Sequence, residues 1–74
     1  MIIKQVLDKY QRYVKKNGVT PKYLLISCDL NSELRQSVRD LPLGYGKWKG
    51  DVFYFAGMKV LEVKEDNDFI EVVR

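Results

Sequence analysis

No histidine occurs among the 74 residues of this chain, and Cys28 is its only cysteine. The usual zinc sites need several histidine or cysteine ligands, so this inventory excludes them. A single thiol cannot form a disulfide within the chain, and we expect Cys28 to be a small buried hydrophobe in a reducing cytoplasm. Histidine is also the commonest base that activates a nucleophile. We therefore expect no metal, no cofactor and no enzymatic activity.

Long hydrophobic segments are also missing, because no apolar run approaches the roughly 18 residues that a membrane-spanning helix needs. The first residues, MIIKQVLDKYQRY, mix apolar and charged positions and include an acid. This pattern indicates a folded amphipathic helix and not a signal peptide. We expect a single domain over residues 1–74 and no membrane partner. A chain this short buries only roughly 60% of its unfolded surface, so self-association would help its thin core.

Two segments contain residues typical of ligand loops, but with the wrong spacing. GYGKWKG, residues 44–50, is one residue too long for the dinucleotide fingerprint and has a helix before it and a strand after it, the reverse of the required order. A phosphate loop would continue from Lys47 with Ser or Thr, where this chain has Trp48. The acidic segment EVKEDND, residues 62–68, lacks the calcium-loop pattern and indicates a solvated turn. Neither segment predicts a cofactor site.

The segment LPLGYGKWKGD, residues 41–51, still supplies candidate interaction residues. Tyr45 and Trp48 could stack on nucleic-acid bases while Lys47 and Lys49 neutralise phosphates. The same aromatic residues suit a protein interface. In a purely structural interpretation, Trp48 folds back over one end of the core and the glycines free the loop. The sequence leaves these three interpretations open and favours the structural and protein-binding ones over nucleic acid.

The first half of the chain predicts one helix and one strand. Apolar residues recur at helical spacing over residues 2–16, and Lys15 and Lys16 suit the negative end of a helix dipole. Gly18 then fits the left-handed position that ends a helix. The apolar run YLLISC, residues 23–28, is bounded by turn signals and predicts a buried strand.

A second helix and three strands should follow. Asp29 or Asn31 can cap this helix, which Pro42 would end. The strands are rich in β-branched and aromatic residues and cover residues 51–57, 58–65 and 68–74. With turns at Gly57 and at residues 66–67, they predict a three-stranded antiparallel meander. The fold class is therefore α+β, with two helices on a small, mostly antiparallel sheet of about four strands in the order α-β-α-β-β-β.

Charge is divided unevenly along the chain. Residues 1–50 contain 10 basic and 4 acidic side chains, whereas residues 51–74 contain 3 basic and 6 acidic ones. Such asymmetry can steer partners, either a second copy placed head to tail or an acidic macromolecule on the first half.

Two segments, TPKYLLISCDLNSELRQSV and FYFAGMKVLEVKEDNDFIEVV, resemble the central, capsomer-axis domain of the tailed-phage major capsid fold. The likeness covers residues 21–73 apart from the loop. Its features are Pro21, the strand at residues 23–27, Leu34, the Gly-x-x-Val at residues 57–60 and Phe69. The long spine helix, the arm and the extended hairpin that link capsid subunits are missing. The resemblance implies a small phage or prophage accessory protein, located in the host cytoplasm or the virion, and it transfers no site residues.

The leading functional hypothesis is thus a non-catalytic phage-type accessory protein that acts by protein–protein contact or self-assembly. The alternative is a small nucleic-acid-binding module that combines the basic first helix with the GYGKWKG loop.

Overall fold

The computed structural model describes residues 2–40, 44–64 and 67–74. Their elements are, in chain order, α1 (Ile2–Asn17), β1 (Tyr23–Ser27), α2 (Cys28–Asp40), β2 (Gly46–Lys49), β3 (Val52–Phe55), β4 (Met58–Val63) and β5 (Ile70–Val73). The α+β class is confirmed. The sheet has five strands, one more than expected, because part of the segment treated as a loop forms the edge strand β2.

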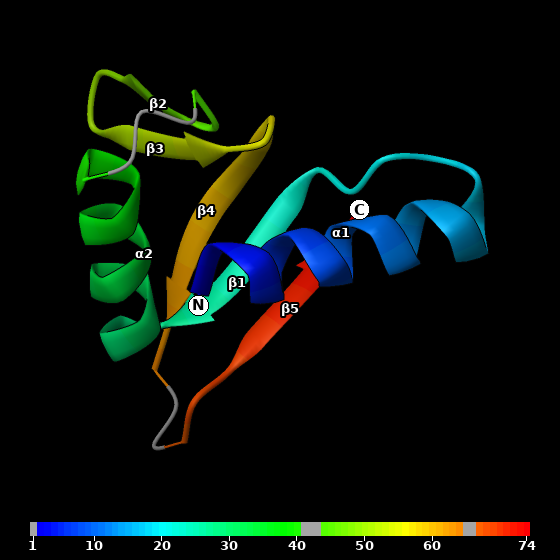
Figure 1. Ribbon diagram of the computed structural model, residues 1–74, viewed down its shortest axis with the longest axis horizontal. Helices are drawn as coiled ribbons and strands as arrows, with labels where there is room; N and C mark the ends of the chain where they lie inside the picture. The colour runs from blue at the N-terminus through cyan, green and yellow to red at the C-terminus, as the bar shows by residue number, and fades with distance from the viewer. Residues whose placement is uncertain (1, 41–43, 65–66) are drawn as a thin grey trace.

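The sheet is mixed, with the strand order β2-β3-β4-β1-β5. β1 runs parallel to β4 and antiparallel to β5. The expected meander is wrong at one step, because β1 lies between β4 and β5. Two parallel neighbouring strands need a crossover connection. The crossover from β1 to β4 includes α2 and the β2–β3 hairpin (Figure 1).

Helix α1 forms as its periodicity predicts. Ile2, Ile3 and Val6 are buried, while its last turn contains two lysines. Gly18 follows with φ 73°, and its amide donates a hydrogen bond to the carbonyl of Val14 at 2.8 Å. This left-handed residue satisfies a carbonyl of the last turn. Among the described residues, no helix is long and apolar enough to cross a membrane.

Helix α2 starts earlier than expected, at Cys28, directly after β1. The predicted caps are therefore wrong: Asp29 lies in the first turn and Asn31 lies inside the helix, buried. The prediction that Cys28 is buried is also wrong, because the strand ends one residue before it and its thiol is exposed on the first turn. Pro42, the predicted stop, lies outside the described residues.

Both helices cover the same face of the sheet, with α1 crossing in front of it in Figure 1 and α2 at its left. One core cluster joins them to the sheet and contains Ile2, Ile3, Val6, Leu24, Ile26, Leu34, Phe53, Phe55, Met58 and Val72. Gly46 allows α2 to approach β2 closely, since a Cβ there would collide with Cγ1 of Val38. The hairpin is thus held against α2.

Two tight turns link the strands around the hairpin. Gly50 and Asp51 join β2 to β3, with Gly50 at φ 59°. Ala56 and Gly57 join β3 to β4, and both have positive φ, 51° and 82°. Positive φ at both central residues is typical of the type I′ turn. The turn predicted at Gly57 is confirmed, and Asp66 of the other predicted turn lies outside the described residues.

Candidate binding surfaces

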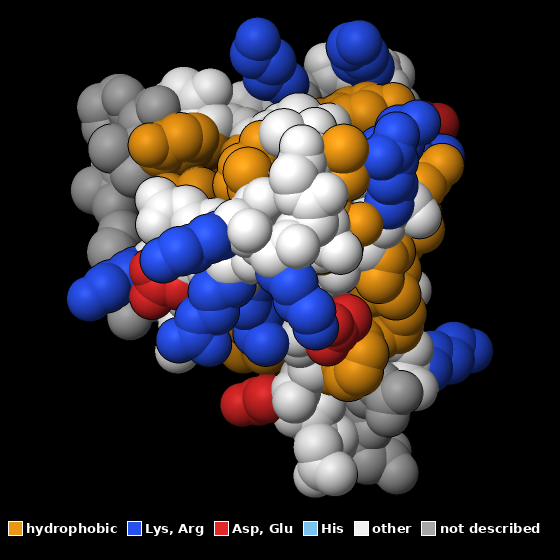
Figure 2. Space-filling model, turned by 90° about the vertical axis from the view of Figure 1, so that its right-hand side faces the viewer, with side chains coloured by type: hydrophobic (Ala, Val, Ile, Leu, Met, Phe, Trp, Pro, Cys, Tyr) orange, Lys and Arg blue, Asp and Glu red, His pale blue; other side chains and the backbone are white. Residues whose placement is uncertain are grey.

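The sheet has one covered face and one open face. Side chains alternate along each strand, so residues opposite the core cluster point away from both helices. The register places on this open face Lys47, Lys49, Val52, Tyr54, Lys59, Leu61, Val63, Tyr23, Leu25 and Val73. Glu71 has the same register, but on the edge strand β5 it also lines the hollow beside α1. In Figure 2, hydrophobic side chains gather along the right-hand margin, which is the rear of Figure 1 and therefore this face. An open face is usually polar, and this one is mostly aromatic and aliphatic.

A row of alternating lysine and tyrosine crosses this face. Lys47 pairs with Tyr54, Tyr54 with Lys59, Lys59 with Tyr23, and Tyr23 with Val73. We call these first four residues the Lys–Tyr row. It contains no acidic residue, and the acid that the register places on the neighbouring row is at the far edge of the sheet, on β5. Each tyrosine therefore has a lysine as its immediate neighbour.

A hollow opens at the β2–β3 end of the row. Its volume is about 370 Å³, and Tyr45, Lys47, Lys49 and Tyr54 are among its lining residues. The Nζ of Lys49 lies 5.3 Å from the ring centre of Tyr54, within cation–π range. Tyr45 is exposed at the rim, and its ring centre lies 5.8 Å from that of Phe55. Three of the four predicted interaction residues thus share one hollow.

Trp48, the fourth predicted residue, lies on the opposite face of β2. It pairs with Phe53, and the two ring centres are 5.1 Å apart. The guanidinium of Arg35 lies 5.0 Å from the centre of the Trp48 ring. The indole is still 55% exposed, so it does not close the core as the structural interpretation had it. Among the large hydrophobic side chains that the structure describes, that of Trp48 is the most exposed.

A second cleft surrounds this indole. It has a volume of about 350 Å³ and is lined by Arg35, Val38, Arg39, Trp48 and Phe53. We call it the Trp48 cleft. It lies between α2 and the hairpin and contains two guanidinium groups and three apolar side chains.

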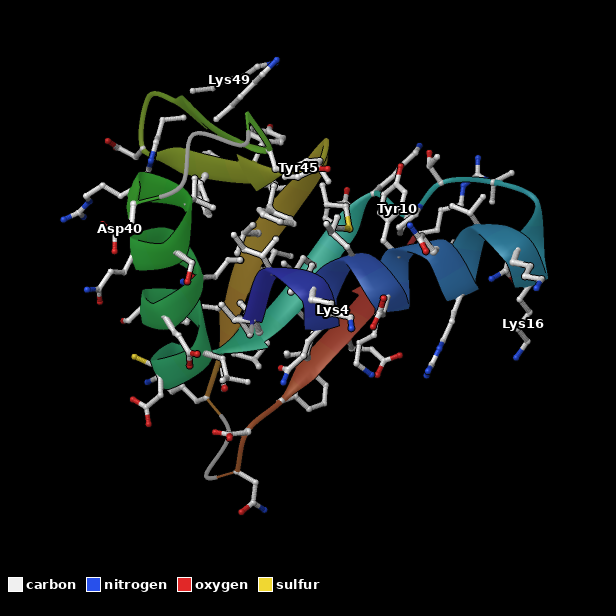
Figure 3. All side chains as sticks on the ribbon, in the orientation of Figure 1. Lys4, Tyr10, Lys16, Asp40, Tyr45 and Lys49 are labelled. Carbon is white, nitrogen blue, oxygen red and sulfur yellow. The ribbon has the colours of Figure 1, made fainter. Side chains whose placement is uncertain are left out.

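The basic residues of α1 form a separate surface. Lys9, Arg12 and Lys16 line a hollow of about 240 Å³ beside β5, together with Glu71. Figure 3 shows Lys16 at the far right of the molecule and Lys49 at its top. The structure therefore does not bring the first helix and the GYGKWKG segment together into one surface.

Several residues of both surfaces escaped the sequence analysis. Tyr54, Lys59 and Tyr23 were assigned only to strands, and Arg35 and Arg39 only to a helix. The alternation of Lys47, Trp48 and Lys49 is the one local signal that β2 contributes to two opposite surfaces. The sheet order decides which further tyrosines and lysines lie beside this strand, and the sequence does not reveal that order.

Outside these surfaces, the polar groups of the described residues that we consider are possible metal ligands and two buried side chains. Within residues 2–40, 44–64 and 67–74, no three Cys, Asp or Glu side chains gather closely enough to hold a metal ion. Asn31 is 1% exposed and its Nδ2 donates to Oε1 of Glu62 at 3.0 Å, while its Oδ1 has no partner among the described residues. The Oγ of Ser27 accepts a hydrogen bond from the amide of Phe69 at 3.3 Å. These contacts join α2 and β1 to the end of the sheet.

Comparison of the chain with models of protein families, with curated proteins and with solved structures finds no match. The phage attribution rests on the sequence resemblance alone, and the function has to be argued from the two surfaces.

Proposed function

We propose that this chain is a non-catalytic binding domain for single-stranded nucleic acid, which lies across the open face of the sheet. The observation that carries the proposal is the Lys–Tyr row. Stacking of bases on aromatic rings and neutralisation of phosphates by cations are the two interactions that bind single strands without sequence preference. The sequence favoured a protein partner, and the sheet order changes that ranking for this face.

The spacing of the row suits an extended strand. Tyr54 and Tyr23 are separated by one intervening strand, so they lie roughly 10 Å apart across the sheet. Each ring can therefore stack on a different base. Lys59 lies between them, and Lys47 and Lys49 flank Tyr54 at the hairpin. The backbone phosphates on either side of each stacked base would therefore lie near a lysine ammonium group.

A second copy of this chain suits the same face less well. A symmetric face-to-face dimer brings the centres of the two faces together. β4 is the central strand, and Lys59 is one of its outward residues. The middle outward residue of β4 is Leu61, and Lys59, next to it on that face, would lose water in each copy, which is costly. A polyanion places opposite charge at the same point.

The experiment is a titration of a dye-labelled oligothymidylate or oligouridylate of about 12 nucleotides, long enough for the site sizes common in such proteins. Fluorescence anisotropy at low salt should show saturable binding. Tyr54→Ala should weaken it about fivefold or more, because one stacked base contributes about 1–3 kcal/mol. Lys59→Gln should weaken it as well.

Two controls make the result specific. Lys16→Gln removes one positive charge from the hollow on α1 and should leave the affinity unchanged within about twofold, apart from long-range charge effects. Sedimentation of the free protein should show a monomer. The proposal is wrong if neither oligonucleotide binds at low salt, if Lys16→Gln weakens binding as much as Lys59→Gln, or if a dimer covers the open face.

The association of this domain with a phage or prophage, in the host cytoplasm or the virion, stays a prediction of the resemblance. A protein partner also stays open for the other face of the hairpin.

A further inference from the structure

We propose that the Trp48 cleft is the docking site for a protein partner, which inserts an apolar side chain flanked by carboxylates of an acidic peptide segment. The cleft lies on the face of β2 opposite the Lys–Tyr row, so this proposal does not depend on nucleic-acid binding. It gives the protein-binding interpretation of the sequence a defined surface.

The apolar part of the cleft is already assembled. Trp48 packs on Phe53, with ring centres 5.1 Å apart and an angle of 34° between the rings. Val38 of α2 completes the apolar lining. The cleft volume of about 350 Å³ suits one large side chain and is small for a longer ligand. Tryptophan and arginine are among the residues that most often dominate protein interfaces.

The charged part of the cleft is positive only. Arg35 and Arg39 line it, and no acidic residue does so within the described part of the chain. The guanidinium of Arg35 lies over the ring of Trp48 at 5.0 Å and near that of Phe53 at 5.7 Å. Aromatic contact uses the flat side of a guanidinium and leaves its edge donors for a carboxylate, which can accept two parallel hydrogen bonds.

The two elements that border the cleft are packed directly against each other. Gly46 lets α2 pack directly against β2, and Val38 fills the space where a Cβ would be. The hairpin is closed by the short turn at Gly50 and Asp51. A partner therefore meets a backbone framework that is already assembled, and only exposed side chains such as those of Arg35 and Arg39 have to be ordered on binding.

Nucleic acid fits this cleft less well than an acidic peptide. Two cations beside one apolar hollow do not form a track for a phosphate chain. Asp40 follows Arg39 directly, and Asp51 lies in the turn after β2. Both acids would repel a chain of phosphates that continued along either element. Isolated carboxylates in a short peptide avoid this repulsion because they can be spaced to meet the arginines alone.

The test starts from an unbiased selection. The full chain is labelled with a dye at Cys28, its one thiol, which is exposed at the opposite end of α2 from Arg39. A yeast-displayed library of random peptides of about eight residues, the scale of common recognition motifs, is sorted for binding. The enriched peptides should contain Asp or Glu on both sides of Leu, Phe or Trp.

Trp48 is the only tryptophan, so its emission reports on the cleft itself. An enriched peptide without tryptophan should shift this emission saturably. Arg35→Gln and Arg39→Gln should each weaken the peptide about tenfold, the effect expected for a hydrogen-bonded charge pair. Tyr54→Ala, on the other face, should leave peptide affinity unchanged within about twofold. Urea denaturation of each variant, with a free energy of unfolding near that of the parent chain, shows that the fold is intact.

Three results would overturn the proposal. The first is a selection that enriches no peptide, or only peptides without acidic residues. The second is peptide binding that neither arginine variant weakens. The third is a shift of Trp48 emission on addition of the oligothymidylate that is lost in Arg35→Gln, which would assign the cleft to nucleic acid. Binding to the oligonucleotide that Tyr54→Ala abolishes, with no shift of Trp48 emission, would leave both proposals standing and show that the two faces act separately.

Discussion

Lys47 and Trp48 are neighbours in the chain, yet their side chains lie on opposite faces of the sheet. Lys47 lines the hollow beside Tyr54, whereas Trp48 lies in the cleft beside Arg35. The strand β2 therefore contributes to two surfaces that face different directions. Residues 46–49, which the sequence placed in a loop, form an edge strand whose side chains alternate between two faces.

Salt should weaken oligonucleotide binding by a predictable amount. If Lys47, Lys49 and Lys59 each neutralise one phosphate, the logarithm of the association constant should fall against the logarithm of salt with a slope of about −2, since each contact on a single strand contributes about −0.7. Lys59→Gln should reduce this slope by about 0.7. Anisotropy titrations at four salt concentrations measure both slopes. A slope near zero would mean that phosphates are not bound by this row.

Gly46→Ala should destabilise the protein through a single collision. The added Cβ would overlap Cγ1 of Val38, and overpacking of this kind typically costs about 1–3 kcal/mol. Adding Val38→Ala should recover part of the loss, because that variant removes the methyl group in the way. Urea denaturation of the two single variants and the double variant gives the coupling energy. Gly50→Ala is the control, because its added Cβ would meet nothing within 4 Å. Its loss of unfolding free energy comes from the positive φ of 59°, so adding Val38→Ala should not recover that loss.

Ala56 is the residue whose replacement should stabilise the chain. It has φ 51°, which is unfavourable for a residue with a Cβ, and it precedes Gly57 in a type I′ turn. Asparagine tolerates this conformation, so Ala56→Asn should raise the free energy of unfolding by about 0.5–1 kcal/mol. Ala56→Val should lower it, because a β-branched side chain is worse at positive φ. A midpoint of thermal unfolding that falls in Ala56→Asn would contradict the turn assignment.

Asn31 should tolerate an apolar replacement better than an acidic one. Its buried Oδ1 has no partner among the described residues, and its one bond goes to Glu62, which is exposed and can return to water. Asn31→Leu should therefore be neutral or more stable by about 1 kcal/mol. Asn31→Asp should lose several kcal/mol, because it buries a carboxylate beside that of Glu62. Calorimetric unfolding of both variants measures the difference, and a large loss in Asn31→Leu would mean that the carbonyl has a bound water.

The helices could be predicted from the sequence because their signals are local. The spacing of Ile3, Val6 and Leu7, the lysines of the last turn and the left-handed Gly18 all act within a few residues of each other. The start of α2 could not be placed, because the last residue of β1, Ser27, is held in the sheet by Val63 and Phe69, which lie far away in the chain. The exposure of Cys28 follows from that boundary.

The sheet and the surfaces depended on contacts that the sequence does not encode locally. β1 looked like a lone buried strand, and nothing in its residues says that β4 and β5 are its two neighbours. Without that strand order, nothing in the sequence indicates that Lys59 and Tyr23 lie in one row with Tyr54. The edge strand β2 was missed because its four residues contain one glycine and two lysines, which are poor strand formers. Once the strand is known, the alternation of Lys47, Trp48 and Lys49 places the indole and the ammonium groups on opposite faces.

Photochemical cross-linking tests the use of the open face most directly. An oligonucleotide of about 12 residues that contains bromouridine is irradiated in complex with the full chain, and the linked peptides are identified by mass spectrometry. Stacked aromatic side chains are the expected partners, so the cross-links should fall on Tyr54 and Tyr23. Cross-links confined to Trp48 or to α1, or a complete absence of cross-links under conditions where the oligonucleotide is bound, would contradict the assignment of this face.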